Sequence, residues 1–225
     1  GEPVAIFGDY DVDGLVSAGL LTQVLTRLGA GRVSVWLPSR QAEGYGFSPA
    51  ALQRCLDGGR PGLILTADCG TNDREAVGHA NALGIEVVVT DHHACSETPA
   101  PAHAVVNPRR TPDSDQALLA GVGVAFKLCH ALVKDGRDRG LPRARTLDLR
   151  DYLDRVAVGT VADVVPLIGE NRTLVQHGLR LLNGQRALCW QVLADVAGIV
   201  GPLDARHIGF RLGPRLNAAG RMGSP

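Results

Sequence analysis

The chain has 225 residues, 45% of them hydrophobic and 20% charged, and no net charge at neutral pH, a composition typical of a globular protein that buries a substantial core. This excludes an intrinsically disordered chain, and no stretch approaches the roughly 18 uncharged apolar residues of a membrane-spanning helix. The five cysteines form no C-x-x-C pair, which argues against a disulfide framework or a zinc ribbon, and the N-terminus lacks the features of a signal peptide, so we expect a cytoplasmic protein without a membrane partner.

Short β-branched runs alternate with helical patterns over the first half of the chain. The predicted strands cover residues 4–7, 33–37, 63–66, 86–90 and 104–106. The predicted helices follow the first strand up to Gly29, run from Ser48 and Pro49 to about Gly58, and run from about Asn72 to Leu83. This alternation predicts an α/β fold with a five-stranded parallel sheet and crossover helices.

Beyond Pro112 the strand signals fade and the chain becomes mostly helical. Helices are predicted at residues 121–133, 149–159, 171–182, 187–197 and 205–212. The highly charged segment 134–150, which contains Pro142, is predicted to be an exposed loop or hinge. We therefore expect an α/β catalytic domain at residues 1–135 and a helical part at residues 136–225 that completes the catalytic core.

The first predicted strand is followed by Asp9, Asp11 and Asp13 in the pattern D-x-D-x-D-G. The same pattern opens the calcium loop of an EF-hand, which ends in a glutamate at its twelfth position. Here that position is Leu20, and a run of strand formers precedes the loop in place of an amphipathic helix. The sequence therefore argues against an EF-hand.

Further acidic and histidine residues follow other predicted strands. Asp68 follows the third strand, Asp91, His92 and His93 follow the fourth, and Asp163 comes later. Taken alone, Asp68 would fit a helix cap equally well. The carboxyl ends of parallel strands meet at one edge of a sheet, however, and carboxylates gathered there repel one another unless cations lie between them. The pattern therefore predicts a centre of two metal ions.

Mixed carboxylate and imidazole ligands suit Mn²⁺, Fe²⁺, Co²⁺ or Zn²⁺, whereas a site of oxygen ligands alone would favour Mg²⁺ or Ca²⁺. We expect two Mn²⁺ ions, with Mg²⁺ as the alternative. Two ions about 3.5 to 4 Å apart need a shared carboxylate, and Asp68 is the natural bridge, with Asp11 and Asp13 divided between the ions. Such a centre activates a water molecule, which predicts hydrolysis of a phosphoester or a phosphoanhydride.

The absence of net charge hides an asymmetry along the chain. Residues 1–100 contain 6 basic and 12 acidic side chains, and residues 101–225 contain 17 basic and 11 acidic ones. A basic second half that faces an acidic metal site suits a substrate rich in phosphate, although a solvated surface of mixed charge explains the numbers equally well.

The segments around these residues follow the order found in the DHH phosphoesterases: G-D-Y-D-V-D-G at 8–14, T-A-D-C-G at 66–70, T-D-H-H at 90–93 and G-T-V-A-D-V-V-P-L at 159–167. Three more segments resemble the RecJ branch of single-stranded-DNA-specific exonucleases: V-N-P-R-R at 106–110, A-G-V-G-V-A-F-K-L at 120–128 and G-P-R-L-N-A-A-G-R-M-G at 213–223. The resemblance implies a metal-dependent hydrolase that degrades single-stranded DNA from its 5′ end to mononucleotides in bacterial recombination and DNA repair. It also implies a catalytic-core fragment of a longer protein, which continues toward a DHHA1-like domain.

Carried over residue by residue, the resemblance implies the metal ligands Asp11, Asp13, Asp68, His92 and Asp163, with Asp9 at or beside the ions. Asp68 and His92 thereby belong to the catalytic set. In the related family-II pyrophosphatases a histidine precedes the two ligand aspartates by four residues. Phe7 holds that place here, which argues against a pyrophosphatase.

Other positions are predicted to bind the substrate or to support the ligands. The resemblance assigns His93 and Arg109 to catalysis and to the scissile phosphate, while Asp91 is expected to orient a neighbouring histidine. A second group of candidates for phosphate binding is Arg215, Asn217 and Arg221. Two glycines, Gly121 and Gly123, are expected either to bind an anion or to allow close packing. The candidates for base stacking are the aromatic residues Tyr10, Tyr45 and Phe47.

Two alternatives to the exonuclease remain. One is a DHH-family phosphodiesterase that acts on short RNA or cyclic dinucleotides, although the glycine-rich C-terminal motif of those enzymes is missing from this sequence. The other is a binding module similar to the Cdc45-type replication proteins, which have lost metal ligands that are all present here. The resemblance implies single-stranded DNA as the partner, together with a single-strand-binding protein and a RecQ-type helicase.

Overall fold

The computed structural model describes the chain except residues 40–42, 112, 185–186 and 223–225, and except the side chains of residues 220–222. The five predicted strands are present and form one parallel sheet, which confirms the predicted fold class. In the order β2-β1-β3-β4-β5, they are β2 (Arg32–Trp36), β1 (Pro3–Gly8), β3 (Leu63–Ala67), β4 (Glu86–Thr90) and β5 (Ala104–Val106).

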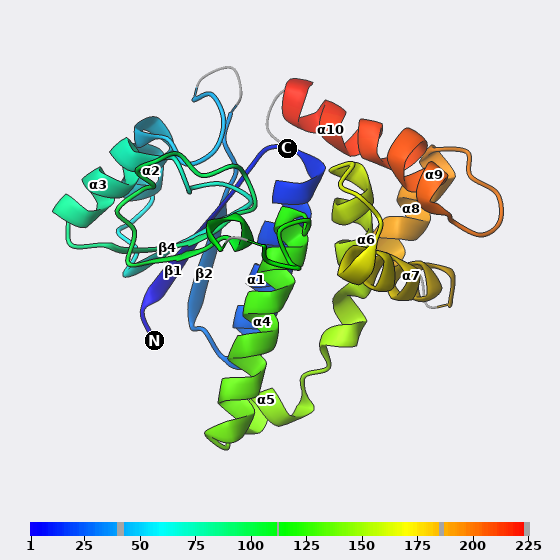
Figure 1. The fold of residues 1–225 in the computed structure, drawn as a ribbon, viewed down its shortest axis with the longest axis horizontal. Helices are drawn as coiled ribbons and strands as arrows, with labels where there is room; N and C mark the ends of the chain where they lie inside the picture. The colour runs from blue at the N-terminus through cyan, green and yellow to red at the C-terminus, as the bar shows by residue number, and fades with distance from the viewer. Residues whose placement is uncertain (40–42, 112, 185–186, 223–225) are drawn as a thin grey trace.

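Helices cover both faces of the sheet (Figure 1). They are α1 (Val12–Leu28) and α4 (Gly121–Asp138) on one face, and α2 (Pro49–Asp57) and α3 (Arg74–Ala82) on the other. Successive strand side chains point to opposite faces, so Ile6 of β1 packs with α1 and α4, whereas its neighbours Ala5 and Phe7 pack with α2 and α3. Two apolar cores therefore hold the sheet in place.

Local signals bound these helices, and those at Ser48 and Gly29 were predicted from the sequence. Asp11 and Ser48 cap α1 and α2 by accepting hydrogen bonds from the backbone N–H groups of Gly14 and Ala51. Gly29 ends α1 in the left-handed conformation, with φ 106°. The start of α1 is thus fixed immediately beyond β1, where the first acidic cluster lies.

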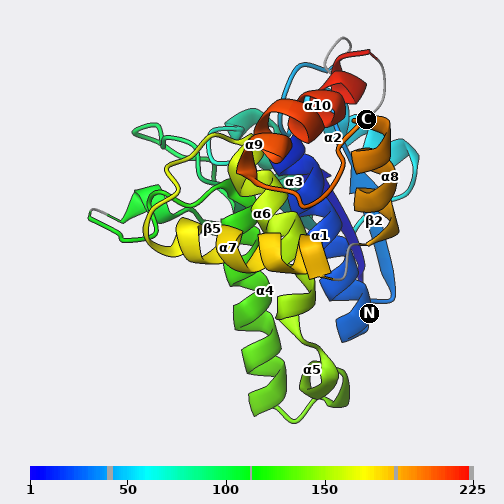
Figure 2. The same ribbon diagram turned by 90° about the vertical axis from the view of Figure 1, so that its right-hand side faces the viewer.

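The second half is helical, as predicted, and packs against α1 and α4. Its elements, with three short 3₁₀ or π turns labelled η, are η1 (Pro108–Arg110), α5 (Pro142–Thr146), η2 (Leu149–Tyr152), α6 (Leu153–Ala162), α7 (Gly169–Gly184), α8 (Leu188–Val196), α9 (Ala205–His207), η3 (Ile208–Leu212) and α10 (Gly213–Met222). Figure 2 shows α7 crossing α6, and a Cβ atom on Gly178 of α7 would overlap the backbone of Leu153. Close packing therefore holds α7 against α6. No helix in the described part of the chain is long and apolar enough to cross a membrane.

The prediction of an exposed loop or hinge at residues 134–150 was wrong. Helix α4 continues to Asp138, and Pro142 begins α5 instead of breaking a helix. Ala144 is fully buried, and the Arg137 side chain donates hydrogen bonds to the carbonyl groups of Ala144 and Leu147. The many charged residues indicated solvent exposure, but Ala144, Leu147 and Leu149 of the same segment are buried in the core.

The division predicted between residues 1–135 and 136–225 falls inside α4, and one apolar core contains residues from both sides of it, among them Val124 and Leu174. The last helix predicted from the sequence ends at Leu212, so α10, which begins at Gly213, was not predicted. Pro214 lies in the first turn of α10, where no backbone N–H donor is needed. This helix brings the C-terminal segment to the start of α1.

Candidate metal centre

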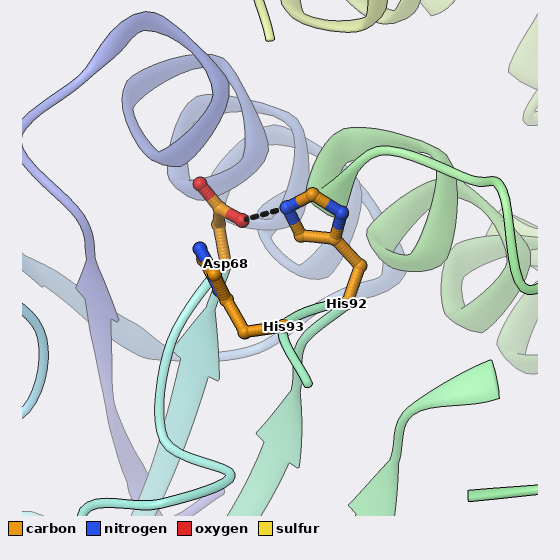
Figure 3. Close-up of side chains that lie close together, drawn as sticks. All are labelled: Asp68, His92 and His93. Carbon is orange, nitrogen blue, oxygen red and sulfur yellow. Dashed lines mark ion pairs between the residues drawn. The ribbon is translucent and has the colours of Figure 1, made fainter. Parts of the chain in front are cut away.

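The predicted ligands gather at the carboxyl edge of the sheet, where the strand order reverses between β1 and β3. Asp13 lies in the first turn of α1, Asp68 follows β3, and His92 and His93 follow β4, as Figure 3 shows for the last three. Asp163 joins them from the end of α6. Both halves of the chain therefore supply ligand candidates to one site.

His92 lies at the middle of this cluster. Its Nε2 atom is 3.1 Å from Asp68 Oδ1, 3.6 Å from Asp163 Oδ2 and 3.9 Å from Asp13 Oδ2. Within the described chain, both ring nitrogens of His92, Asp68 Oδ1 and Asp163 Oδ2 are buried and have no hydrogen-bond partner. Buried polar atoms without partners are costly, and a cation would satisfy them. The mixed oxygen and nitrogen donors fit a divalent transition metal such as Mn²⁺.

Asp13 is held by the N-terminus of α4. Its carboxylate accepts hydrogen bonds from the backbone N–H groups of Gly121 at 2.6 Å and Val122 at 3.0 Å. Even so, burial raises its pKa well above 3.8, and the charges of Asp68 and Asp163 raise it further. The helix amides position the carboxylate but do not offset its desolvation, which leaves a role for a cation.

Asp68 is buried and adopts the left-handed backbone conformation, with φ 66°. Its backbone N–H donates to the carbonyl of Thr90, which joins the ends of β3 and β4. Burial raises the pKa of Asp68 well above 3.8, and the neighbouring charge of Asp11 raises it further. A strained backbone under a buried acid is typical of functional sites, where the surrounding fold compensates the cost.

Asp91 orients the histidine pair, as predicted. Its Oδ1 accepts hydrogen bonds from the backbone N–H groups of His92 and His93 and pairs with His93 Nδ1 at 2.8 Å. The hydrogen bond to Asp91 raises the pKa of His93 to about 9. His93 therefore carries a proton at neutral pH, and its half-exposed ring lies within 4.8 Å of ligand atoms of Asp68 and His92.

Asp9 and Asp11 lie at the edge of the centre. The two groups of close ligand atoms are Asp68, His92 and His93, and Asp13, His92 and Asp163, and neither contains Asp9 or Asp11. Asp11 caps α1, and the charge on its side chain raises the pKa values of Asp68 and Asp163, while Asp9 accepts a hydrogen bond from the Tyr10 N–H at 2.7 Å. Their binding to metal remains a prediction.

The predicted phosphate-binding residues approach the centre from two sides. Arg109 is exposed in η1, and its charge lowers the pKa of Asp163. Asn217 Oδ1 accepts a hydrogen bond from the Val12 N–H at 3.0 Å, so α10 is anchored to the start of α1. Arg215 is exposed and donates to the carbonyl of Arg211, and the side chain of Arg221 lies outside the described part. The phosphate roles therefore remain predictions, and Asn217 has a structural contact that the sequence did not indicate.

Two glycines leave the space that the carboxylates of the centre occupy. A Cβ atom on Gly121 would overlap the Asp68 carboxylate, with the Asp68 Cγ atom 2.6 Å away, and one on Gly159 would lie 2.7 Å from Asp13 Oδ1. Both predicted roles of Gly121, anion binding and close packing, hold in part. Its backbone N–H binds an anionic group, but that group is the Asp13 carboxylate. Its lack of a side chain also leaves room for Asp68. Gly159 was not singled out, although it begins the segment that contains Asp163.

The aromatic candidates for base stacking fall into two classes. Phe47 is buried and packs against Phe7, with ring centroids 4.6 Å apart, so its predicted contact with substrate was wrong. Tyr45 is exposed, and its ring centroid lies 6.4 Å from that of Tyr10. Only the tyrosines are open to a ligand.

Replacing Val164 with asparagine is expected to stabilise the protein by about 1 kcal/mol, because a β-branched residue in the left-handed region is strained. Val164 follows Asp163, has φ 61° and is 85% exposed, so little packing is lost. Thermal unfolding in EDTA measures the change. Val192→Asn, at an exposed helical position of α8, is the control and should show no gain. Equal or lower stability of Val164→Asn would contradict the prediction.

Adding Mn²⁺ is expected to raise the melting temperature more at about pH 8 than at about pH 5. The folded-state pKa values of Asp13 and Asp68 lie above the ordinary value of 3.8. The stability that these groups contribute is therefore complete below 3.8 and is lost as the pH rises through the raised values. A cation offsets this loss because it binds the ionised carboxylates.

The readout is the difference between melting temperatures in Mn²⁺ and in EDTA at each pH. The change of melting temperature with pH in EDTA alone does not isolate the two carboxylates. The pKa of His93 is raised from 6.5 to about 9, so its deprotonation also lowers the stability of the protein as the pH rises over that interval. An equal effect of Mn²⁺ at the two pH values would show that these carboxylates do not bind the ion.

Comparison with known proteins places this geometry in a family. Residues 3–160 match the DHH family, N-terminal domain. The chain is 41% identical to the single-stranded-DNA-specific exonuclease RecJ of Escherichia coli over 99% of its own length and 39% of that protein. It is 39% identical to the protein of the same name from Thermus thermophilus, over 99% of this chain and 31% of that one. The chain thus spans less than half the length of these relatives.

Solved structures agree with the sequence match. Exonuclease RecJ bound to manganese superposes with a TM-score of 0.84 at 39% identity, over 100% of this chain and 54% of that one. RecJ of Thermus thermophilus in complex with Mg²⁺ gives a TM-score of 0.66 at 34% identity, over 99% of this chain and 27% of that one. With the family match covering more than half of its residues, the chain belongs to the DHH family.

Proposed function

We propose that this chain is the metal-binding catalytic core of an exonuclease that hydrolyses single-stranded DNA from its 5′ end to mononucleotides, in recombination and DNA repair. The observation that carries the proposal is the cluster of buried, unpartnered ligand atoms on Asp68, His92 and Asp163. The names and bound metals of the similar proteins support the same activity. The alternative phosphodiesterase on short RNA or cyclic dinucleotides has no comparable support.

The protein's own residues divide the work. Asp13, Asp68, His92 and Asp163 would hold two Mn²⁺ ions, or Mg²⁺ in their place, with Asp9 and Asp11 at the edge. When bound, such ions supply an activated water and stabilise charge on the attacking and leaving oxygens. The chain supplies the rigid support: α4 amides hold Asp13, and Asp91 fixes the His93 ring on the substrate side.

Two cationic side chains are suited to the scissile phosphate. His93 is held in its charged form by Asp91 and is half-exposed, so it can donate a hydrogen bond to a phosphate oxygen. Arg109 is exposed, and its charge lowers the pKa of Asp163. We assign both to the scissile phosphate, and Arg215, Asn217 and Arg221 to one other phosphate, the 5′ end group of the DNA. A single-strand-binding protein and a RecQ-type helicase are the expected partners, in the bacterial cytoplasm.

The test is release of label from 5′- and 3′-labelled single-stranded DNA by the chain in Mn²⁺. Mononucleotides should appear from the 5′-labelled end first and should be absent for Asp163→Asn. Asp151→Asn, an exposed aspartate of η2, is the matched control and should retain full activity. Turnover of cyclic dinucleotides or short RNA without cleavage of DNA would support the phosphodiesterase instead.

A further inference from the structure

Asn107 is the first residue after β5 and is buried, with 6% of its surface exposed. Both ends of its side-chain amide are bonded to neighbouring segments. The Nδ2 atom donates to the carbonyl of His93 and to Thr71 Oγ1, each at 2.9 Å. The Oδ1 atom accepts a hydrogen bond from the backbone N–H of Arg109, also at 2.9 Å. One side chain therefore joins the segments that follow β3, β4 and β5.

The partners of this amide fix its orientation. A backbone carbonyl only accepts hydrogen bonds and a backbone N–H only donates them, so the NH₂ group of Asn107 must face His93 and its oxygen must face Arg109. Asn107 thus supplies a donor and an acceptor at the same time. Aspartate lacks the donor, and serine is too short to reach both partners.

A second path leads from Asn107 to the ring of His93. Thr71 is fully buried, and its hydroxyl oxygen accepts the hydrogen bond from Asn107. Thr71 also binds Asp91, through its side chain and through its backbone N–H, which lies 2.9 Å from Asp91 Oδ2. Asp91 in turn pairs with Nδ1 of the His93 ring. The main chain of His93 and the orientation of its ring therefore both depend on Asn107.

On its other side, Asn107 closes the turn that carries Arg109. Its backbone is extended, with φ −139° and ψ 115°, as expected for a residue that precedes a proline, here Pro108. Its Oδ1 atom caps η1 by accepting from the N–H two residues further along, the pattern of an Asx turn. The backbone from which the exposed Arg109 side chain extends is therefore fixed relative to His93.

The proposed function requires two cations from different loops to meet one phosphate. A displacement of about 1 Å at a reacting group can cost about 100-fold in rate, so the two loops must not move independently. We propose that Asn107 is a positioning residue that fixes His93 and Arg109 relative to each other and so matches both to the scissile phosphate. This inference rests on the proposed function. Asn107 acts through these two residues and is not itself a metal ligand.

Two substitutions remove the arms of this network in turn. Asn107→Ser keeps an oxygen that accepts from the Arg109 N–H, as in an ST turn, but does not reach His93, and Asn107→Ala keeps neither bond. Asn107→Ser should lower kcat/KM on single-stranded DNA by about 10-fold to 100-fold, and Asn107→Ala should lower it further. Asn183→Ser is the matched control and should retain wild-type activity, because the Asn183 amide likewise bonds a backbone carbonyl and N–H, those of Leu203, at the end of α7.

Combined variants separate positioning from a contribution to folding. In a His93→Ala background, Asn107→Ser should change kcat/KM by no more than about 2-fold, because the group that it positions is gone. In an Arg109→Ala background, Asn107→Ser and Asn107→Ala should have equal activity. Thermal unfolding shows that each variant folds. A loss from Asn107→Ser that is equally large with and without the His93 side chain would overturn the proposal.

Binding of inorganic phosphate separates this proposal from the nuclease function, because it requires no cleavage. Calorimetric titration of the protein in Mn²⁺ measures it. Asn107→Ser should weaken phosphate binding by about 5-fold or more, and the same change should have no effect in a His93→Ala background. Phosphate binding that depends on Asn107 in a chain that does not cleave DNA would retain the positioning role and reject the nuclease. Cleavage and phosphate binding that are both unchanged in Asn107→Ser would overturn the positioning role.

Discussion

The Asp68→Asn variant is expected to lose nuclease activity by at least about a thousand-fold and yet to unfold at a higher temperature than the wild type in EDTA. Activity falls because the central carboxylate ligand is removed. Stability rises because the buried acid is desolvated and lies near Asp11, Asp91 and Asp163, all of which raise its pKa. The expected gain is about 1 kcal/mol or more, which corresponds to a few degrees for a domain of this size.

Two comparisons make this result specific. Asparagine tolerates the left-handed backbone better than most residues, so part of the gain could come from φ alone. Asp113→Asn tests this, because Asp113 is exposed with φ 57° and has no place in the cluster. Mn²⁺ should stabilise the wild type and Asp113→Asn more strongly than Asp68→Asn. A lower melting temperature for Asp68→Asn in EDTA would show that Asp68 is a structural residue.

Gly121→Ala is expected to weaken Mn²⁺ binding by at least about 100-fold and to reduce activity to a similar extent. Helix propensity alone predicts the opposite sign, a gain of about 1 kcal/mol for alanine in α4. Steric overlap outweighs it, because the added methyl group would occupy the space of the Asp68 carboxylate, with Asp68 Cβ 2.7 Å away. Calorimetric titration with Mn²⁺ measures the affinity, and thermal unfolding shows whether the chain still folds.

Gly123→Ala is the matched control, two residues further along the same helix. The three atoms nearest to its Cβ would all belong to the Leu119 side chain, the closest at 3.1 Å, so a small shift of that side chain makes room. Mn²⁺ affinity of this variant should equal that of the wild type. If Gly121→Ala also binds Mn²⁺ normally, Asp68 has room to move, and the geometry of the centre is less constrained than its contacts indicate.

Much of the site could be predicted because its ligands follow the strands directly. Alternation between strand and helix patterns placed β1, β3 and β4 in one parallel sheet, and parallel strands bring their carboxyl ends to one edge. Asp13, Asp68 and His92 therefore had to lie close together once the strands were recognised. Asp163 was harder, because it comes from a helix end, and its place relied on family resemblance and not on the pattern of strands.

By itself the sequence determined the α/β class, the five strands, the end of α1 at Gly29, the Ser48 cap of α2 and the chemistry of the ligands, since all of these follow from residue types and spacing within short segments. Only the tertiary structure decided the contacts between distant segments. The backbone amides of α4 bind Asp13, and Asn217 binds the start of α1. The structure also decided that Phe47 is buried while Tyr45 is exposed. It also corrected residues 134–150, where charge indicated a loop but Ala144 and Leu147 are buried. Local patterns record which groups a segment offers, whereas burial and contact depend on what the rest of the fold places beside them.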